Sequence, residues 1–149
     1  MKKLINNKKG FTLIELLAVI VILAILVMVA IPAVTKYLNA ARQGTFADNA
    51  QAAISAVRND VIKSGKGNKT YTLTEINALL EKQLKTSPFG AAYDTNSYIK
   101  VTQTCGEQNN CTYKYTMCLA DADGHGFKDL DENAIAESSV GMSNVKCSS

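Results

Sequence analysis

One apolar run near the amino terminus constrains this chain more than any other feature. Between Leu13 and Val34 only Glu15 and the imino acid Pro32 interrupt the apolar side chains. A helix of about 22 residues is about 33 Å long, which is enough to cross the hydrocarbon core of a bilayer. Four lysines and no acidic residue precede the run, so the positive-inside rule keeps this end in the cytoplasm. A secretory signal would have a shorter apolar core with a small-residue cleavage site after it, so the sequence favours a spanning helix.

Glu15 is the exception within this run. An ionised carboxylate in hydrocarbon is costly unless it is paired. The sequence offers no cation nearby within the apolar segment, so we expect Glu15 to have no local partner. Its partner should then come from elsewhere, through processing or through assembly.

The residues around Glu15 resemble the processing site of type IV prepilins with a short leader. Residues 8–17 read KKGFTLIELL, which combines a basic leader, a glycine, a phenylalanine, a glutamate and an apolar run. The close resemblance covers residues 8–43. It implies that a prepilin peptidase in the membrane cuts between Gly10 and Phe11 and methylates the new amine of Phe11. It also implies that Glu15 pairs with the Phe11 amine of a neighbouring subunit in a filament, where each charge offsets the desolvation of the other.

The same comparison predicts three parts: a leader at 1–10, a transmembrane and filament-core helix at 11–34, and a globular head at 35–149. Pro32 removes a helical hydrogen bond, and we expect a kink near residues 28–32 because the apolar periodicity resumes immediately. In pilins that this chain resembles, a proline here marks where the helix can melt. Many of them also carry a glycine eight residues earlier, where this chain has Ala24.

The head is predicted to be α+β. The long kinked helix becomes amphipathic after Pro32 and ends at residues 64–68. A second short helix begins at the capping-box pattern of Thr72 and Glu75 and continues to about Leu84. Residues 98–104 and 112–117 alternate with the period of strands and read as a hairpin, with one further strand at 138–142. We therefore expect a long helix packed against a small antiparallel sheet, with a disulfide-closed loop at the carboxyl end.

Four cysteines all follow the predicted helices, and their number is even. A zinc site is the rival interpretation, but the spacing lacks the close pairs that zinc sites favour. Three disulfide connectivities are possible. We favour one bond at the hairpin end and one that pins the carboxyl-terminal loop to the sheet, the second of which also resembles the loop-closing disulfide of many pilins: Cys105–Cys111 and Cys118–Cys147. Such bonds require an oxidising compartment.

One acidic loop has the spacing of a twelve-residue calcium loop. Counted from Asp121, it supplies oxygen ligands at positions 1, 3, 7, 9 and 12 and a glycine at position 6. His125 stands where an aspartate or asparagine is usual, and no flanking helices are evident. A plain acidic turn is the alternative. The candidate calcium ligands are Asp121, Asp123, His125, the Phe127 carbonyl, Asp129 and Glu132.

Charge and motifs narrow the function classes. The chain has a net charge of +3, but loss of the four leader lysines leaves about −1, which gives little reason to expect nucleic-acid binding. Four tyrosines could form an exposed patch that stacks on bases, although strand tyrosines are more often core or contact residues: Tyr93, Tyr98, Tyr113 and Tyr115. His125 is the only histidine, and neither a nucleophile with a plausible base nor a phosphate-binding loop appears. The sequence does not predict an enzyme.

We therefore interpret the chain as a structural subunit of a type IV pilus that supports adhesion or surface motility. Its expected partners are other copies of itself, the prepilin peptidase, the assembly machinery and the cytoplasmic membrane, before export to an extracellular pilus. No cofactor is required, and calcium is the only candidate. A pseudopilin of a type II secretion or DNA-uptake system shares the same amino terminus and is the closest alternative. A monomeric membrane-anchored calcium-binding module is the alternative of another class.

Overall fold

The computed structural model describes residues 10–106 and 110–148. By its internal contacts the chain forms two units, one ending at Leu38 and one comprising Asn39–Ser149. We call the second unit the head. A single helix, α1 (Leu13–Ser64), contributes to both units and contains Pro32 without interruption. The expected kink at Pro32 stays a prediction.

Within the head, one stripe of α1 forms the centre of the core. The side chains of Phe46, Ala50, Ala53, Val57 and Val61 recur every three or four residues and are all fully buried, as an amphipathic helix requires. The helix ends at Ser64. Gly65 follows it with a φ of 65°, which suits glycine, and its amide donates to the Val61 carbonyl at 2.9 Å.

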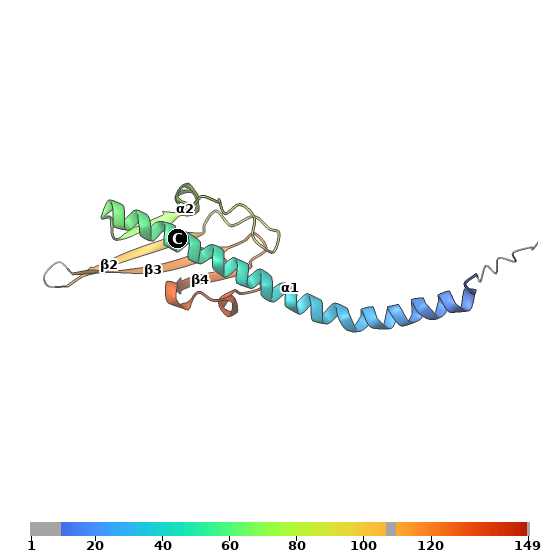
Figure 1. Ribbon diagram of the computed structural model, residues 1–149. Coiled ribbons are helices and arrows are strands. Elements are labelled where there is room, and N and C mark those ends of the chain that lie inside the picture. The colour runs from blue at the N-terminus through green and yellow to red at the C-terminus, as the bar shows by residue number, and fades with distance from the viewer. Residues whose placement is uncertain (1–9, 107–109, 149) are drawn as a thin grey trace, which may run out of the picture. The chain divides into compact units, whose positions relative to one another are not determined.

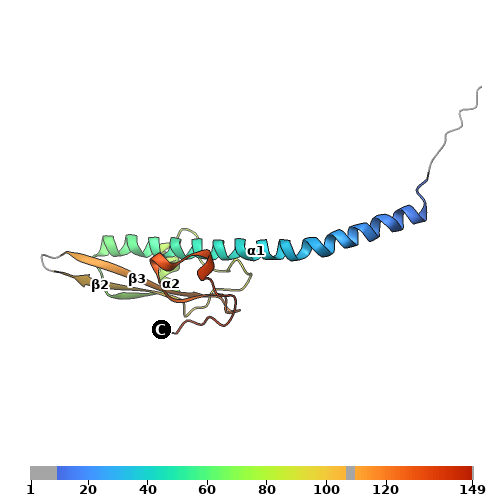
Figure 2. The ribbon, with the colours of Figure 1, turned by 90° about the horizontal axis from the view of Figure 1, so that it is seen from below.

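The core face of α1 packs on a four-stranded antiparallel sheet (Figures 1 and 2). Its strands lie in the order in which they occur in the chain, and each pairs with the next. The strands are β1 (Lys69–Thr72), β2 (Tyr98–Cys105), β3 (Cys111–Ala120) and β4 (Gly126–Asp131). Ile99, Met117 and Leu119 are fully buried on the side that faces α1.

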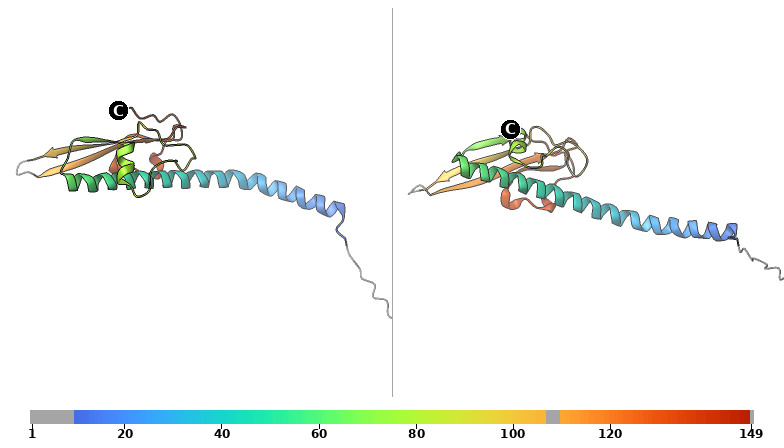
Figure 3. Two further views of the ribbon diagram at one scale, coloured as in Figure 1. Left: turned by 90° about the horizontal axis from the view of Figure 1, so that it is seen from above. Right: turned by 45° about the horizontal axis from the view of Figure 1, so that its top comes forward.

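A short helix and a long connection fill the space between β1 and β2. Helix α2 (Leu73–Leu79) begins at the predicted capping box, in which Thr72 and Glu75 each accept from the other's backbone amide. The connection then crosses one flank of α1 (Figure 3). It joins the sheet through a bridge between Tyr93 and Asp121, with the amide of Asp94 donating to the Ala120 carbonyl at 2.8 Å.

The segment after β4 follows the opposite flank of α1 (Figures 1 and 3). It contains two short 3-10 turns, η2 (Glu132–Ala134) and η3 (Glu137–Ser139). Three α1 side chains hold it: Gln43 donates to the Val140 carbonyl, Gln51 donates to the Ile135 carbonyl and Arg58 pairs with Glu132. The chain then reaches the outer face of the sheet, where Cys147, Cys118 and Ala120 form a second small cluster.

The predicted fold class is confirmed: a long amino-terminal helix packs on an antiparallel sheet whose carboxyl-terminal region is closed by a disulfide. Several boundaries were wrong. The strand expected at 138–142 is instead the turn η3 and a single bridge between Gly141 and Gly126. Helix α2 stops at Leu79, because the Asn77 side chain binds both backbone groups of Leu84 and holds the chain in another conformation. The strands β1 and β4 were not predicted.

Candidate functional site

The amino-terminal segment carries the residues of the predicted processing site. Gly10 and Phe11 precede α1 and are exposed, and Phe11 shows 89% of its surface. The amide of Leu16 donates to the Thr12 carbonyl at 3.2 Å, which is the first helical bond. Lys8 and Lys9, like the rest of the leader before Gly10, lie outside the described residues.

Glu15 has a local partner that we did not expect. Its Oε2 accepts hydrogen bonds from the backbone amide and the hydroxyl of Thr12, both at 2.8 Å. The Glu15 amide in turn donates to the Thr12 hydroxyl at 3.3 Å, which completes a capping box. The expectation that Glu15 has no local partner was therefore wrong. The sequence has a threonine followed three positions later by a glutamate, which is the capping-box pattern. This pattern could have revealed the partner.

Beyond Glu15 the side chains of α1 are apolar as far as Val34, and the polar residues Thr35 and Lys36 follow. Its helical residues from Leu13 to Leu38 leave large side chains at least half exposed almost throughout. By length and composition α1 has one segment able to cross a membrane, with a mean hydropathy of 3.2. At Pro32 the missing amide leaves one helical bond unmade, and next to it the Thr35 hydroxyl donates to the Ile31 carbonyl at 2.9 Å.

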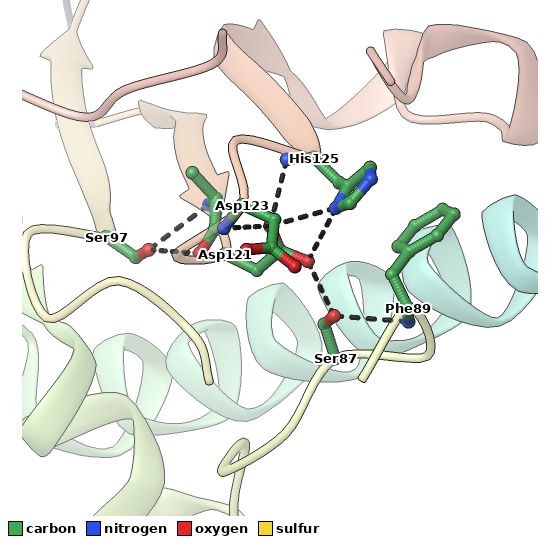
Figure 4. Close-up of polar contacts among 7 residues, drawn as sticks. Ser87, Phe89, Ser97, Asp121, Asp123 and His125 are labelled. Atoms are coloured by element: carbon green, nitrogen blue, oxygen red, sulfur yellow. Dashed lines mark hydrogen bonds and ion pairs between the residues drawn. The ribbon is translucent and has the colours of Figure 1, made fainter. Parts of the chain in front are cut away.

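In the head, the acidic loop is organised around the buried carboxylate of Asp121 (Figure 4). The Ser87 hydroxyl donates to its Oδ2 at 2.6 Å. Its Oδ1 accepts the backbone amides of His125 at 2.9 Å and Asp123 at 3.1 Å. The imidazole Nδ1 of His125 lies 3.0 to 3.1 Å from the two carboxylate oxygens. One carboxylate thus ties the turn between β3 and β4 to the connection before β2.

These contacts determine the pKa of Asp121. Burial acts to raise the pKa, but the hydrogen bonds from Ser87 and His125 and the charge of the imidazole favour the ionised form more strongly. The net result is a pKa below the ordinary value of 3.8. A carboxylate that is ionised and bonded on both oxygens serves well as a structural anchor.

His125 is held on its second side by an aromatic ring. Its imidazole stacks on Phe89, with centroids 4.2 Å apart and planes 12° apart, and the Phe89 amide donates to the Ser87 hydroxyl at 3.2 Å. Because the Ser87 hydroxyl binds Asp121 rather than the imidazole (Figure 4), these three side chains lack the order of an activated serine.

The six candidate calcium ligands do not converge. Asp121 and His125 lie together, whereas Phe127 and Asp129 belong to β4 and Glu132 follows it. Asp129 accepts a hydrogen bond from the Tyr98 hydroxyl, and Glu132 pairs with Arg58 on α1. Within residues 10–106 and 110–148, no three His, Cys, Asp or Glu side chains are grouped in a way that could hold a metal ion. No cofactor is indicated for this loop.

The four cysteines form the two favoured disulfides. Cys105 and Cys111 face each other across the β2–β3 hairpin, and Cys118 on β3 joins Cys147. The first bond lies near the hairpin end, and the second is buried on the outer face of the sheet. Of the tyrosines considered for base stacking, Tyr93 and Tyr115 are core residues and Tyr98 and Tyr113 are partly buried.

Comparison with known protein families gives one match, at the amino terminus. Residues 5–31 match the family described as the prokaryotic N-terminal methylation motif. The match covers Lys8, Lys9, Gly10, Phe11, Glu15 and most of the apolar run. It is consistent with a type IV pilin-like prepilin and a membrane-anchored precursor. No curated protein and no solved structure matches the chain.

Proposed function

We propose that this chain is a type IV pilin that is processed after Gly10, methylated at Phe11 and assembled into a surface filament through its amino-terminal helix. The observation that carries the proposal is the methylation motif at residues 5–31, joined directly to an apolar helix with exposed side chains. Before assembly the lipid bilayer would cover those side chains. In a filament, the same helix of neighbouring copies would cover them instead.

Glu15 supports a specific assembly step. Both hydrogen bonds from Thr12 use Oε2, so Oε1 has no hydrogen-bond donor among the residues that the structure describes. Cleavage after Gly10 would create a positively charged amine on Phe11. The Phe11 amine of a neighbouring copy could then bind Oε1 without breaking the Thr12 contacts, which would set the axial register of the filament.

Mass spectrometry of the mature protein tests processing. We expect loss of residues 1–10 and an amino-terminal Phe11 heavier by one methyl group. A mature protein that still begins at Met1 would count against a filament function of any kind.

Two substitutions separate charge pairing from helix capping. Glu15→Ala should be inserted and cut but should fail to enter filaments. Glu15→Gln keeps an oxygen that can accept from Thr12 but removes the charge, so it should also fail if pairing with the amine drives assembly. Normal assembly of Glu15→Gln would show that the capping contact suffices.

The use of the filament is a separate question. A pilus would support adhesion or surface motility, and the extracellular filament would follow a single-pass precursor in the cytoplasmic membrane. A pseudopilus of a type II secretion or DNA-uptake system would use the same amino terminus. Electron microscopy of sheared cell surfaces separates them, because long filaments in the sheared fraction indicate a pilus.

A calcium-binding module anchored in the membrane is the alternative of another class. It would require the loop after Asp121 to rearrange, because Asp129 and Glu132 have other partners. Calcium at millimolar concentration should then raise the melting temperature of the wild-type protein but not of Asp121→Ala. Equal melting temperatures with and without calcium would remove this alternative.

A further inference from the structure

The β2–β3 hairpin continues beyond the end of α1 (Figures 1, 2 and 3). Along the face of β2 that packs on the helix, the side chains become less covered toward the hairpin end. Ile99 and Val101 are buried, and Gln103 is half-buried. Cys105 is exposed, and its cross-strand partner Cys111 is half-buried. We call the Cys105–Cys111 bond the hairpin disulfide, and it occupies the core face of the sheet at a point where the helix no longer covers that face.

The other disulfide lies in a different environment. Cys118 is fully buried and Cys147 is 6% exposed, and both pack with Ala120 on the outer face of the sheet. Thiol–disulfide exchange requires a thiolate to reach one of the two sulfur atoms. A thiolate from solution can reach the hairpin disulfide in the folded head, whereas it reaches Cys118–Cys147 only after local opening.

Opening the hairpin disulfide leaves the hairpin paired. On one side of the bond Thr104 lies opposite Thr112 in the ladder, and on the other side the Gly106 amide donates to the Asn110 carbonyl at 3.0 Å. The bonded cysteines are only 6 residues apart in the sequence. Because so short a loop restricts the unfolded chain less than a long one, folding favours the hairpin disulfide over two thiols less strongly than it favours the other bond.

One hydrogen bond distinguishes the two sulfur atoms of the hairpin disulfide. The side-chain amide of Gln103 donates to the Cys105 Sγ at 3.2 Å. The backbone of Gln103 is fixed in turn, since its amide donates to the Asn68 side-chain oxygen at 2.8 Å. A hydrogen bond to a sulfur favours its thiolate form, and the more stable thiolate leaves faster in exchange. Cys105 is therefore the better leaving group, and Cys111 is the sulfur that is attacked.

We propose that the hairpin disulfide is a site of reversible modification by low-molecular-weight thiols. A thiolate from solution attacks the Cys111 Sγ and forms a new S–S bond, while the old bond breaks and Cys105 leaves as a thiolate that takes a proton from water. A second thiolate then attacks the external sulfur and releases Cys111, so that two external thiols are oxidised to one disulfide and the hairpin disulfide is reduced to two thiols. Return attack by the Cys105 thiolate on Cys111 instead expels the external thiol and restores the original bond.

This inference goes beyond the proposed function. It concerns the head alone, and it holds whether the chain forms a pilus, a pseudopilus or no filament.

Reduction of the full-length chain in isolated membranes tests the selectivity. After treatment with millimolar reduced glutathione and alkylation, mass mapping should show Cys105 and Cys111 labelled at least about tenfold faster than Cys118 and Cys147. In denaturant the two disulfides should open at similar rates. Equal rates in the folded chain would overturn the proposal. A tenfold difference that persisted in denaturant would also overturn it, because the fold would then not be the cause.

A short reaction identifies the sulfur that is attacked. Rapid alkylation of the released thiol prevents return attack and traps the mixed disulfide. The tryptic peptide 101–114 contains both cysteines of the hairpin, and tandem mass spectrometry should find glutathione mainly on Cys111. An equal distribution, or a majority on Cys105, would overturn the proposed direction of attack.

Removal of the Gln103 amide supplies the second measurement. Gln103→Met keeps the length of the side chain but has no amide donor, so exchange should slow about fivefold, which corresponds to the loss of one hydrogen bond. The preference for Cys111 should fall with it. Gln83→Met, at an exposed position in the connection before β2, is the matched control and should react like the wild type. An unchanged opening rate of Cys118–Cys147 would verify that the head is intact, and an unchanged rate and preference in Gln103→Met would contradict the proposed direction of attack.

Discussion

At the scale of single residues, Asp121 connects parts of the head that are far apart in the sequence. Its carboxylate receives Ser87 from the connection before β2 and the amides of Asp123 and His125 from the turn before β4. A buried carboxylate with this many donors is stable only in its ionised form, and its removal leaves the donors without an acceptor.

The first prediction concerns the pH dependence of that anchor. Since the pKa of Asp121 in the folded head lies below its ordinary value of 3.8, the ionised carboxylate stabilises the fold above that value. This contribution is lost as the pH falls through the lowered pKa. Asp121→Asn should therefore cost about 1–3 kcal/mol of unfolding free energy at pH 7, and the stabilities of the two proteins should converge as the pH falls below the lowered pKa of Asp121. Denaturant unfolding across pH measures both.

Asp123→Asn is the control for this prediction. Its side chain is exposed in the same turn, and only its backbone amide bonds to Asp121, so we expect almost no change. A pH-independent difference between wild type and Asp121→Asn would show that the effect comes from packing rather than from charge.

Thr12 and the cysteines illustrate what single residues reveal from sequence. The Thr12–Glu15 capping box and the Thr72–Glu75 capping box have the same sequence pattern, but only the second was predicted. Because Glu15 lies in an apolar run, we expected its partner to be a cation and did not consider the neutral hydroxyl of Thr12. The sequence left three disulfide connectivities possible. The observed one was favoured because Cys105 and Cys111 flank a predicted hairpin turn and because a bond from Cys118 to Cys147 resembles the loop-closing disulfide of many pilins.

At the scale of secondary structure, β4 shows where sequence patterns fail. Its residues include two aspartates, a lysine and a glycine, which disfavour strands when taken alone. The backbone bonds to β3 override that preference, and the side-chain pattern of β4 does not reveal them. The twelve-residue spacing of acidic side chains suggested calcium, whereas Asp129 and Glu132 have separate partners, the Tyr98 hydroxyl and Arg58.

Gly126 provides a test of how β4 joins the sheet. Its φ is 146°, and a Cβ there would lie 2.0 Å from the Leu119 carbonyl oxygen. Gly126→Ala should therefore separate β4 from β3 and destabilise the head by about 2–3 kcal/mol. Thermal unfolding followed by the tyrosine signal in near-ultraviolet circular dichroism would measure this.

Gly44→Ala is the matched substitution. Gly44 is helical, and its Cβ would have one neighbour, a Glu137 oxygen at 4.0 Å, so alanine should stabilise α1 by up to about 1 kcal/mol. If both alanine variants changed stability equally, the close approach at Gly126 would not be the cause.

The two disulfides should contribute unequally to stability. They span 6 and 29 residues of sequence, and a longer closed loop restricts the unfolded chain more. Replacing Cys118 and Cys147 together by alanine should cost about 3.5 kcal/mol, and replacing Cys105 and Cys111 about 2.5 kcal/mol. Chemical unfolding of the two double variants would compare them, and a larger loss at the hairpin would contradict loop closure as the main contribution.

At the scale of the whole molecule, the sequence predicted the arrangement of parts better than their contacts. The apolar run, the amphipathic continuation of α1 and the hairpin follow from local periodicity, and each was located correctly. The paths of the irregular segments 79–97 and 132–142 along α1 escaped prediction. Irregular segments show no periodic pattern of apolar residues. Hydrogen bonds between residues far apart in the sequence, such as the bond from the Gln51 side chain to the Ile135 carbonyl, hold them in place.

The last prediction uses the charge of the whole chain. The precursor has a net charge of +3, and cleavage after Gly10 removes four lysines, so the mature chain carries about −1 near neutral pH. Methylation of Phe11 leaves its amine basic and does not offset this change. Two-dimensional electrophoresis of cells with an active prepilin peptidase should therefore show the protein at an acidic position, although the precursor has an isoelectric point near 8.6. Gly10→Val, which places a branched side chain at the cleaved bond, should stay at the basic position, and an acidic position for that variant would show that the bond after residue 10 is not where processing occurs.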